Sequence, residues 1–135
     1  MAGRVSFKCP AGMREILLYL ASSTVGLWGV AHLFATRGVV AGFGDLTEDN
    51  RRVITMEWIV EGVALISTSA FVAVATAIQP EGAVTTAIYA VAMATLVVLA
   101  IVSLFTGFKI AFLPFRLCPF ILGISAALIA GGAWL

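Results

Sequence analysis

Residues 53–78 read VITMEWIVEGVALISTSAFVAVATAI, and this stretch decides the fold class. It is longer than the roughly 20 apolar residues that a helix needs to cross the hydrocarbon core of a bilayer. Three further apolar stretches cover residues 15–36, 83–108 and 117–135. Inside a bilayer each segment must satisfy its own backbone polar groups, which favours helices. The sequence therefore predicts an all-α fold, an integral membrane four-helix bundle.

The composition of the whole chain supports the same class. Of the 135 residues, 61% are hydrophobic and 11% are charged, and the mean hydropathy is +1.10. Four spans with short connections use the whole length, so we expect a single membrane domain, 1–135, surrounded by lipid. The formal net charge of +1, without a dense basic run, argues against a nucleic-acid partner.

The basic residues leave the orientation of the bundle open. More Lys and Arg residues lie on the side reached by the first and third connections than on the N-terminal side. By the positive-inside rule this favours both termini outside the cytoplasm, whereas the basic leader before the first span favours the opposite orientation. The sequence predicts a multi-pass membrane protein without deciding which way it faces.

The connection 37–52 carries the clearest local signals. Its three glycines predict a short apolar dip along the membrane interface. Asp45 followed three residues later by Glu48 matches a capping box in its Asp variant. The second helix is therefore predicted to start in water near Leu46 and to cover 46–79.

Two carboxylates, Glu57 and Glu61, lie inside the second apolar stretch. A charge near the bilayer centre costs at least ~2.5 kcal/mol, so such groups usually face a partner, a cavity or a ligand. They are one helical turn apart and share a face, at about 7 Å and 13 Å below the interface. His32 lies five residues before Arg37 on the preceding antiparallel helix, so we expect His32 and Glu57 in the same layer.

Weaker polar residues extend this face into a polar seam that is expected to point inward. Cys118 belongs to the seam, and the sequence places it on the opposite membrane face from Cys9, so the two should not pair within one chain. Each cysteine is interpreted as a small apolar residue rather than a catalytic thiol. The other members of the seam are Thr68, Thr95, Ser103, Thr106 and Ser125.

Three interpretations of the buried polar groups remain open. As a structural lock, Glu57 or Glu61 would be neutral or paired with a neighbouring base and would fix the helix register. As a proton-handling or small-molecule site, the same groups would work because burial and nearby charge tune their acidity. As a metal site, one histidine and two carboxylates would supply three ligands suited to zinc, iron or manganese.

These interpretations define two sets of candidate residues. The candidate catalytic groups are Glu57, Glu61 and His32, and the candidate ligand-binding groups are Arg37, Thr68 and Arg116. His32 is the single histidine of the chain, so a haem with two histidine ligands would need a dimer. The chain has no Walker loop, nucleophile elbow or zinc-protease motif, so hydrolysis and nucleotide chemistry have no sequence support.

Two short motifs resemble a known family. Arg14 opens an apolar helix that continues through Gly29-Val30-Ala31-His32-Leu33-Phe34 to a glycine-rich turn, which resembles the first helix of DoxX-like small bacterial membrane proteins. Glu61-Gly62 followed by Val63-Ala64-Leu65 resembles their second helix. In that family a lysine often stands at the position of His32, and the segment 45–52 is an addition here. The resemblance implies a four-helix bundle in the bacterial cytoplasmic membrane, and some relatives are associated with quinone-linked sulfur oxidation or redox complexes.

We therefore expect a subunit or accessory of a quinone-linked redox system, with a redox partner subunit and with a quinone or a divalent metal as cofactor. A homo-oligomer that binds or passes a small molecule, proton or ion is an alternative from a different class. A structural or interaction scaffold is the third. The sequence leaves open whether the protein is an enzyme.

Overall fold

The computed structural model describes residues 11–78 and 81–135. Over these ranges the chain forms four helices and no strand. They are α1 (Ala11–Gly42), α2 (Glu48–Ile78), α3 (Ala83–Thr106) and α4 (Leu113–Trp134). Each is long and apolar enough to cross a membrane. The predicted four-helix bundle is thus confirmed. Cys9 lies outside the described residues.

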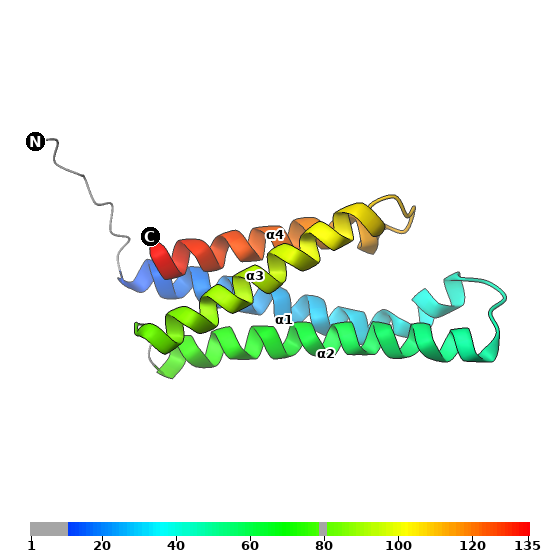
Figure 1. Cartoon of the computed structure of the whole chain (residues 1–135), viewed down its shortest axis with the longest axis horizontal. Helices are drawn as coiled ribbons and strands as arrows, with labels where there is room; N and C mark the ends of the chain where they lie inside the picture. The colour runs from blue at the N-terminus through cyan, green and yellow to red at the C-terminus, as the bar shows by residue number, and fades with distance from the viewer. Residues whose placement is uncertain (1–10, 79–80) are drawn as a thin grey trace, which may run out of the picture.

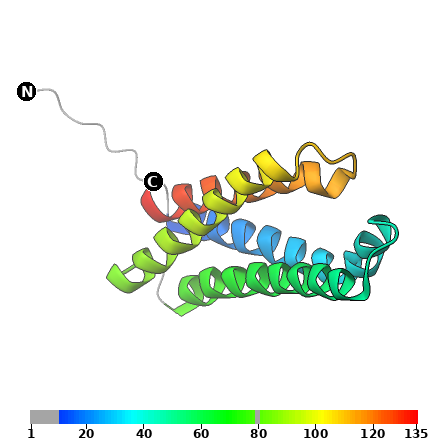
Figure 2. The same ribbon diagram turned by 45° about the vertical axis from the view of Figure 1, so that its right-hand side comes forward.

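The helices alternate in direction, and α1 occupies the centre of the bundle (Figure 1). It packs along α2 on one side and against α4 on the other, and α4 also packs against α3. The contact between α2 and α3 is the weakest of the four helix pairs that touch. Figures 1 and 2 both show α3 running obliquely, so that it diverges from α2 toward the end that holds the connections 43–47 and 107–112. We call this the loop end and the opposite one the terminal end.

Small residues allow α1 and α2 to approach closely. A Cβ atom added at Gly29 would lie 2.7 Å from the carbonyl oxygen of Gly62, and one at Gly62 would lie 3.0 Å from the carbonyl oxygen of Gly29. Further along the same interface, the hydroxyl of Ser69 donates to the carbonyl oxygen of Ser22 at 2.7 Å. Membrane helices commonly associate in this way, because small residues bring the backbones into van der Waals contact.

The interior is filled by large apolar side chains from all four helices, including Leu18, Leu65, Leu96 and Leu122. Tyr89 is the largest fully buried side chain, and its hydroxyl shares a 2.8 Å hydrogen bond with Thr76. The outer surface carries many exposed large apolar residues, which fits contact with lipid.

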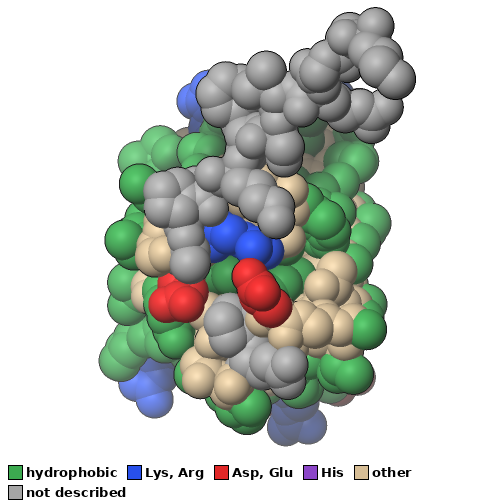
Figure 3. Space-filling model, turned by 90° about the vertical axis from the view of Figure 1, so that its left-hand side faces the viewer, with side chains coloured by type: hydrophobic (Ala, Val, Ile, Leu, Met, Phe, Trp, Pro, Cys, Tyr) green, Lys and Arg blue, Asp and Glu red, His purple; other side chains and the backbone are tan. Residues whose placement is uncertain are grey.

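Arg14 closes the terminal end. Its guanidinium donates to the carbonyl oxygens of Gly132 and Ala133, both at 3.0 Å, and forms a 3.1 Å ion pair with Glu81. Figure 3 shows this end, where basic side chains lie between acidic ones in a largely hydrophobic surface. A basic residue here satisfies the last carbonyl groups of α4 and complements the helix dipole.

The connection between α1 and α2 differs from the prediction. No dip follows residue 36, because α1 continues as a helix to Gly42 and buries Val39 and Val40. The predicted cap is also wrong, since α2 begins at Glu48 and the backbone N–H of Asn50 donates to the hydroxyl of Thr47 at 3.3 Å. Gly44, with a φ of 74°, turns the chain just before Asp45, and this turn moves the helix start beyond the predicted box.

The start of α4 also differs from the prediction. The helix begins at Leu113, four residues before the predicted position 117, with Pro114 in its first turn. Proline fits there because its missing N–H has no intrahelical partner in the first turn. Cys118 consequently lies a full turn inside the helix, about 8 Å from its start at 1.5 Å per residue. This places its thiol deeper in the bundle than the sequence indicated.

Candidate functional site

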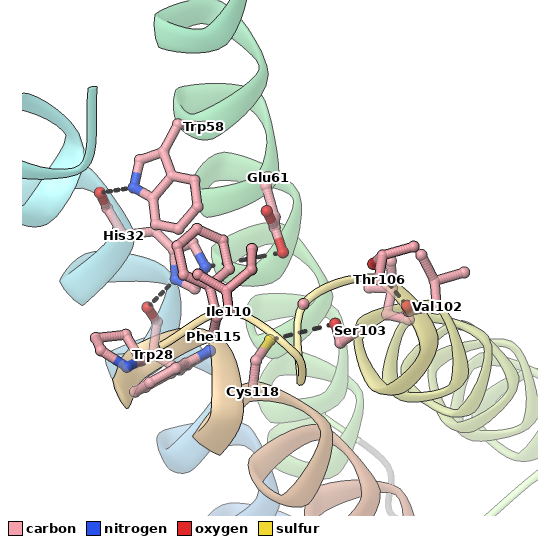
Figure 4. Close-up of a pocket in the computed structure, with 13 residues that line it drawn as sticks. Trp28, His32, Trp58, Glu61, Val102, Ser103, Thr106, Ile110, Phe115 and Cys118 are labelled. Carbon is pink, nitrogen blue, oxygen red and sulfur yellow. Dashed lines mark hydrogen bonds and ion pairs between the residues drawn. The ribbon is translucent and has the colours of Figure 1, made fainter. Parts of the chain in front are cut away.

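A cavity of about 320 Å³ lies among the four helices near the loop end. Trp28, Trp58 and Phe115 provide aromatic walls, and the rings of Trp58 and Phe115 meet edge to face at 5.2 Å. The polar groups of the lining include His32, Glu61, Ser103 and Cys118, which come from four different helices (Figure 4). The cavity therefore combines flat apolar walls with a small set of converging polar atoms, as ligand sites commonly do.

His32 is held rigidly at one side of the cavity. It is 5% exposed, its ring stacks on Trp58 with centroids 4.8 Å apart, and it meets the edge of Trp28 at 5.5 Å. Its backbone carbonyl accepts hydrogen bonds from the indole N–H of Trp58 at 2.8 Å and from the hydroxyl of Thr36 at 2.9 Å. These contacts fix both the backbone and the ring of His32.

The hydrogen bonding of the His32 ring defines its reactive atom. Nδ1 lies 2.8 Å from the backbone carbonyl oxygen of Trp28, and since a carbonyl accepts and never donates, Nδ1 carries the hydrogen. Nε2 then faces Glu61, whose Oε1 is 3.7 Å away. Glu61 is partly exposed toward the cavity, so this nitrogen and this carboxylate together present an acid–base pair to anything bound there.

Cys118 completes the polar side of the cavity. The hydroxyl of Ser103 on α3 donates to its sulfur at 3.5 Å. The sulfur, one nitrogen of His32 and one carboxylate oxygen of Glu61 all lie within 4.8 Å of one another. The indole N–H of Trp28, which lies beside them in Figure 4, is buried and has no hydrogen-bond partner among the described residues.

The structure separates the predicted site residues into two groups. His32 and Glu61 meet at the cavity, whereas Glu57, predicted to share a layer with His32, is exposed and does not line it. The four-position separation of the two carboxylates turns the helix by about 40° beyond a full revolution. This rotation is enough to place Glu61 against α1 and Glu57 on the outer surface of α2.

The three predicted ligand-binding residues lie outside the cavity. Arg37 is exposed near the end of α1. Arg116 is also exposed, and its guanidinium lies 5.5 Å from the ring centroid of Phe108. Thr68 donates its hydroxyl to the carbonyl oxygen of Ala64 within its own helix. None of the three lines the cavity at His32.

Sequence reasoning missed the roles of Trp58 and Cys118 at this site. Trp58 adjoins Glu57 in sequence and was not among the predicted site residues. Cys118 and Ser103 were assigned to the inward-facing polar seam, and their 3.5 Å contact confirms that they face each other. The signal that could have identified Cys118 was its position near the start of the fourth span, on the same membrane side as His32.

A groove adjoins the cavity along the weak α2–α3 contact. It has a volume of about 470 Å³ and is lined by Thr68 and Phe71 of α2 and by small and branched apolar residues of α3 up to Thr95. Leu99, which lines the cavity, is one helical turn after Thr95. The groove and the cavity therefore follow each other along the same helix pair, with the polar cavity nearer the loop end.

Comparison with family models, with curated proteins and with solved structures gave no match for this chain.

Proposed function

We propose that this small membrane protein binds the head group of a lipid-soluble quinone in the cavity beside His32 and Glu61. In this proposal it acts as a subunit or accessory of a quinone-linked redox system in a bacterial cytoplasmic membrane, as its resemblance to DoxX-like proteins implies. The observation that carries the proposal is the aromatic cavity bordered by an acid–base pair and placed near the loop end of the bundle.

The head group of a quinone is flat, apolar on its faces and able to accept hydrogen bonds at two carbonyl oxygens. The cavity volume of about 320 Å³ lies at the small end of the range for ligand pockets. Trp58 and Phe115 supply ring surfaces for stacking. The hydroxyl of Ser103 can turn from the sulfur of Cys118 to donate to a carbonyl oxygen, and His32 and Glu61 place acid–base groups beside it.

The α2–α3 groove supports a ligand with a long apolar tail. The groove opens between two helices that make little contact with each other, so a molecule dissolved in the lipid can reach it from the side. Its apolar lining lies on the terminal-end side of the polar cavity, one helical turn away along α3. An amphipathic molecule would thus place its head in the cavity and its tail along the groove.

Fluorescence quenching by decylubiquinone tests the proposal, because Trp28 and Trp58 line the cavity. We expect saturable quenching with one quinone per chain in the purified protein. Ser103→Phe should weaken binding at least tenfold by occupying the cavity with a ring. The matched control is Ser67→Phe, because Ser67 is exposed on α2 and bonds its own helix, so this variant should bind as the unmodified protein does.

A second variant distinguishes weaker binding from a folding defect. Phe115→Leu keeps an apolar side chain but removes the stacking ring, and we expect it to weaken binding several-fold at an unchanged unfolding midpoint. Absence of saturable quenching, or equal binding by Ser103→Phe and Ser67→Phe, would overturn the quinone site. Native mass spectrometry of protein released gently from its membrane tests the accessory role: a distinct partner subunit supports it, and a bare homo-oligomer refutes it.

A further inference from the structure

We propose that His32, Glu61 and Cys118 form a binding site for one thiophilic divalent cation, zinc or ferrous iron, in the wall of the cavity. This ligand set differs from the histidine and two carboxylates expected from the sequence, because Cys118 replaces the exposed Glu57. The proposal shares His32 and Glu61 with the quinone site, but it depends on three side-chain ligand atoms and not on the aromatic walls.

The spacing of the three ligand atoms is close to that of a tetrahedral site. Bonds of about 2.0–2.3 Å at tetrahedral angles place neighbouring ligand atoms about 3.3–3.7 Å apart. Nε2 of His32 and Oε1 of Glu61 already lie 3.7 Å apart. All three ligand atoms lie within 4.8 Å of one another, so Cys118 has to shift by about 1 Å at most to reach metal-binding distance.

The hydrogen bond of Nδ1 of His32 orients the ring so that Nε2 can bind a metal. Histidine ligands usually donate the N–H that does not face the metal to a carbonyl or carboxylate, which fixes the tautomer and the ring orientation. Nδ1 of His32 makes this bond to the backbone carbonyl of Trp28 at 2.8 Å. Its Nε2 lone pair is consequently directed at the cavity, and the two flanking indole rings prevent the ring from turning away.

Two hydrogen-bond donors next to Cys118 would stabilise a metal-bound sulfur. The hydroxyl of Ser103 donates to the sulfur, and the unpartnered N–H of Trp28 lies in the same wall of the cavity. A negatively charged sulfur accepts hydrogen bonds better than a neutral thiol, so both donors would stabilise the form that binds metal. A set of thiolate, imidazole and carboxylate selects zinc or iron over magnesium and calcium.

The position of the site suggests what the metal would do. The three ligands come from α1, α2 and α4, so a bound ion would cross-link three helices and stabilise the bundle. A tetrahedral ion with three protein ligands keeps its fourth position for water or a ligand. Here that position faces the cavity, because all three side chains line it.

Cobalt(II) is the probe for this site, since a cobalt–thiolate bond gives a charge-transfer band in the near ultraviolet. We expect metal-free full-length protein in detergent to bind one cobalt ion per chain with this band and to lose it on addition of zinc. Cys118→Ser should abolish the band and weaken cobalt binding at least 100-fold. Cys9→Ser, which changes the other cysteine of the chain, is the matched control and should retain the band.

The carboxylate is tested by a second matched pair. Glu61→Gln should keep the band but weaken cobalt binding at least tenfold, whereas Glu57→Gln one turn away should leave the affinity unchanged. The metal site would be overturned by any of three results. These are no band in the unmodified protein, a band that persists in Cys118→Ser, and a band that is lost in Cys9→Ser. Quinone quenching measured on the metal-free protein separates this result from the proposed function, because the two readouts do not share a signal.

Discussion

Gly29→Ala tests the close contact that brings α1 and α2 together at the site. The new Cβ would lie 2.7 Å from the carbonyl oxygen of Gly62 and 3.0 Å from the backbone nitrogen of Ile66. Ordinary contact begins at 3.4 Å, so the two helices have to separate by about 0.7 Å at this point. Two of the three nearest atoms belong to the backbone of α2, so moving the third, Cγ1 of the Ile66 side chain, would not relieve the clash.

Comparison with Gly123→Ala isolates the energetic cost of the clash in Gly29→Ala. Both substitutions gain about 1 kcal/mol of helix propensity, because both replace glycine inside a helix. A Cβ at Gly123 meets nothing within 4 Å, so this variant carries the propensity gain alone. The difference between the two variants is then the cost of overpacking, for which we expect about 1–3 kcal/mol.

Unfolding by sodium dodecyl sulfate in mixed micelles, followed by circular dichroism, measures this difference. We expect Gly29→Ala to unfold at lower detergent fraction than Gly123→Ala. Separation of the helices also lengthens the 3.7 Å distance between His32 and Glu61, so cobalt affinity should fall in Gly29→Ala and not in Gly123→Ala. Equal unfolding midpoints for the two variants would refute the claim that backbone contact holds this interface.

Three further changes test individual contacts by the same unfolding assay. Ser69→Ala should lower the free energy of unfolding by about 0.6 kcal/mol, the average for an interhelical hydrogen bond in a membrane. Ser67→Ala should leave it unchanged, because the Ser67 hydroxyl bonds its own helix. A larger loss of stability in Ser67→Ala than in Ser69→Ala would contradict the interhelical bond of Ser69. Arg14→Gln should lower the free energy of unfolding by about 1–2 kcal/mol, because two carbonyl groups of α4 lose their hydrogen-bond donor. Glu81→Gln should change it little, because that carboxylate is exposed. Equal losses in the two variants would show that the ion pair, and not the carbonyl bonds, supplies the stability. Tyr89→Phe should cost about 1 kcal/mol by removing a buried hydrogen bond, and an unchanged midpoint would argue against that bond.

The polar cluster shows why part of the site could be predicted and part could not. His32 and Glu61 were identified because an ionisable residue in an apolar span is unusual by composition alone. The choice between Glu61 and Glu57 depends on about 40° of helix rotation, which no property of the second span reveals. Cys118 was underestimated because its importance comes from neighbours on α1 and α2 rather than from its own sequence context.

The four apolar segments were enough to predict the membrane class, the all-α fold and the number of spans. These follow from length and hydropathy, which are local properties of each segment. The tertiary structure alone decided which faces meet, because lipid and protein interior are both apolar and the hydrophobic pattern therefore does not mark the inward face of a membrane helix. Backbone contact at Gly29 and Gly62 sets the rotation of α1 and α2 that brings His32 to Glu61, and the packing of α4 against α1 adds Cys118 to the same cavity.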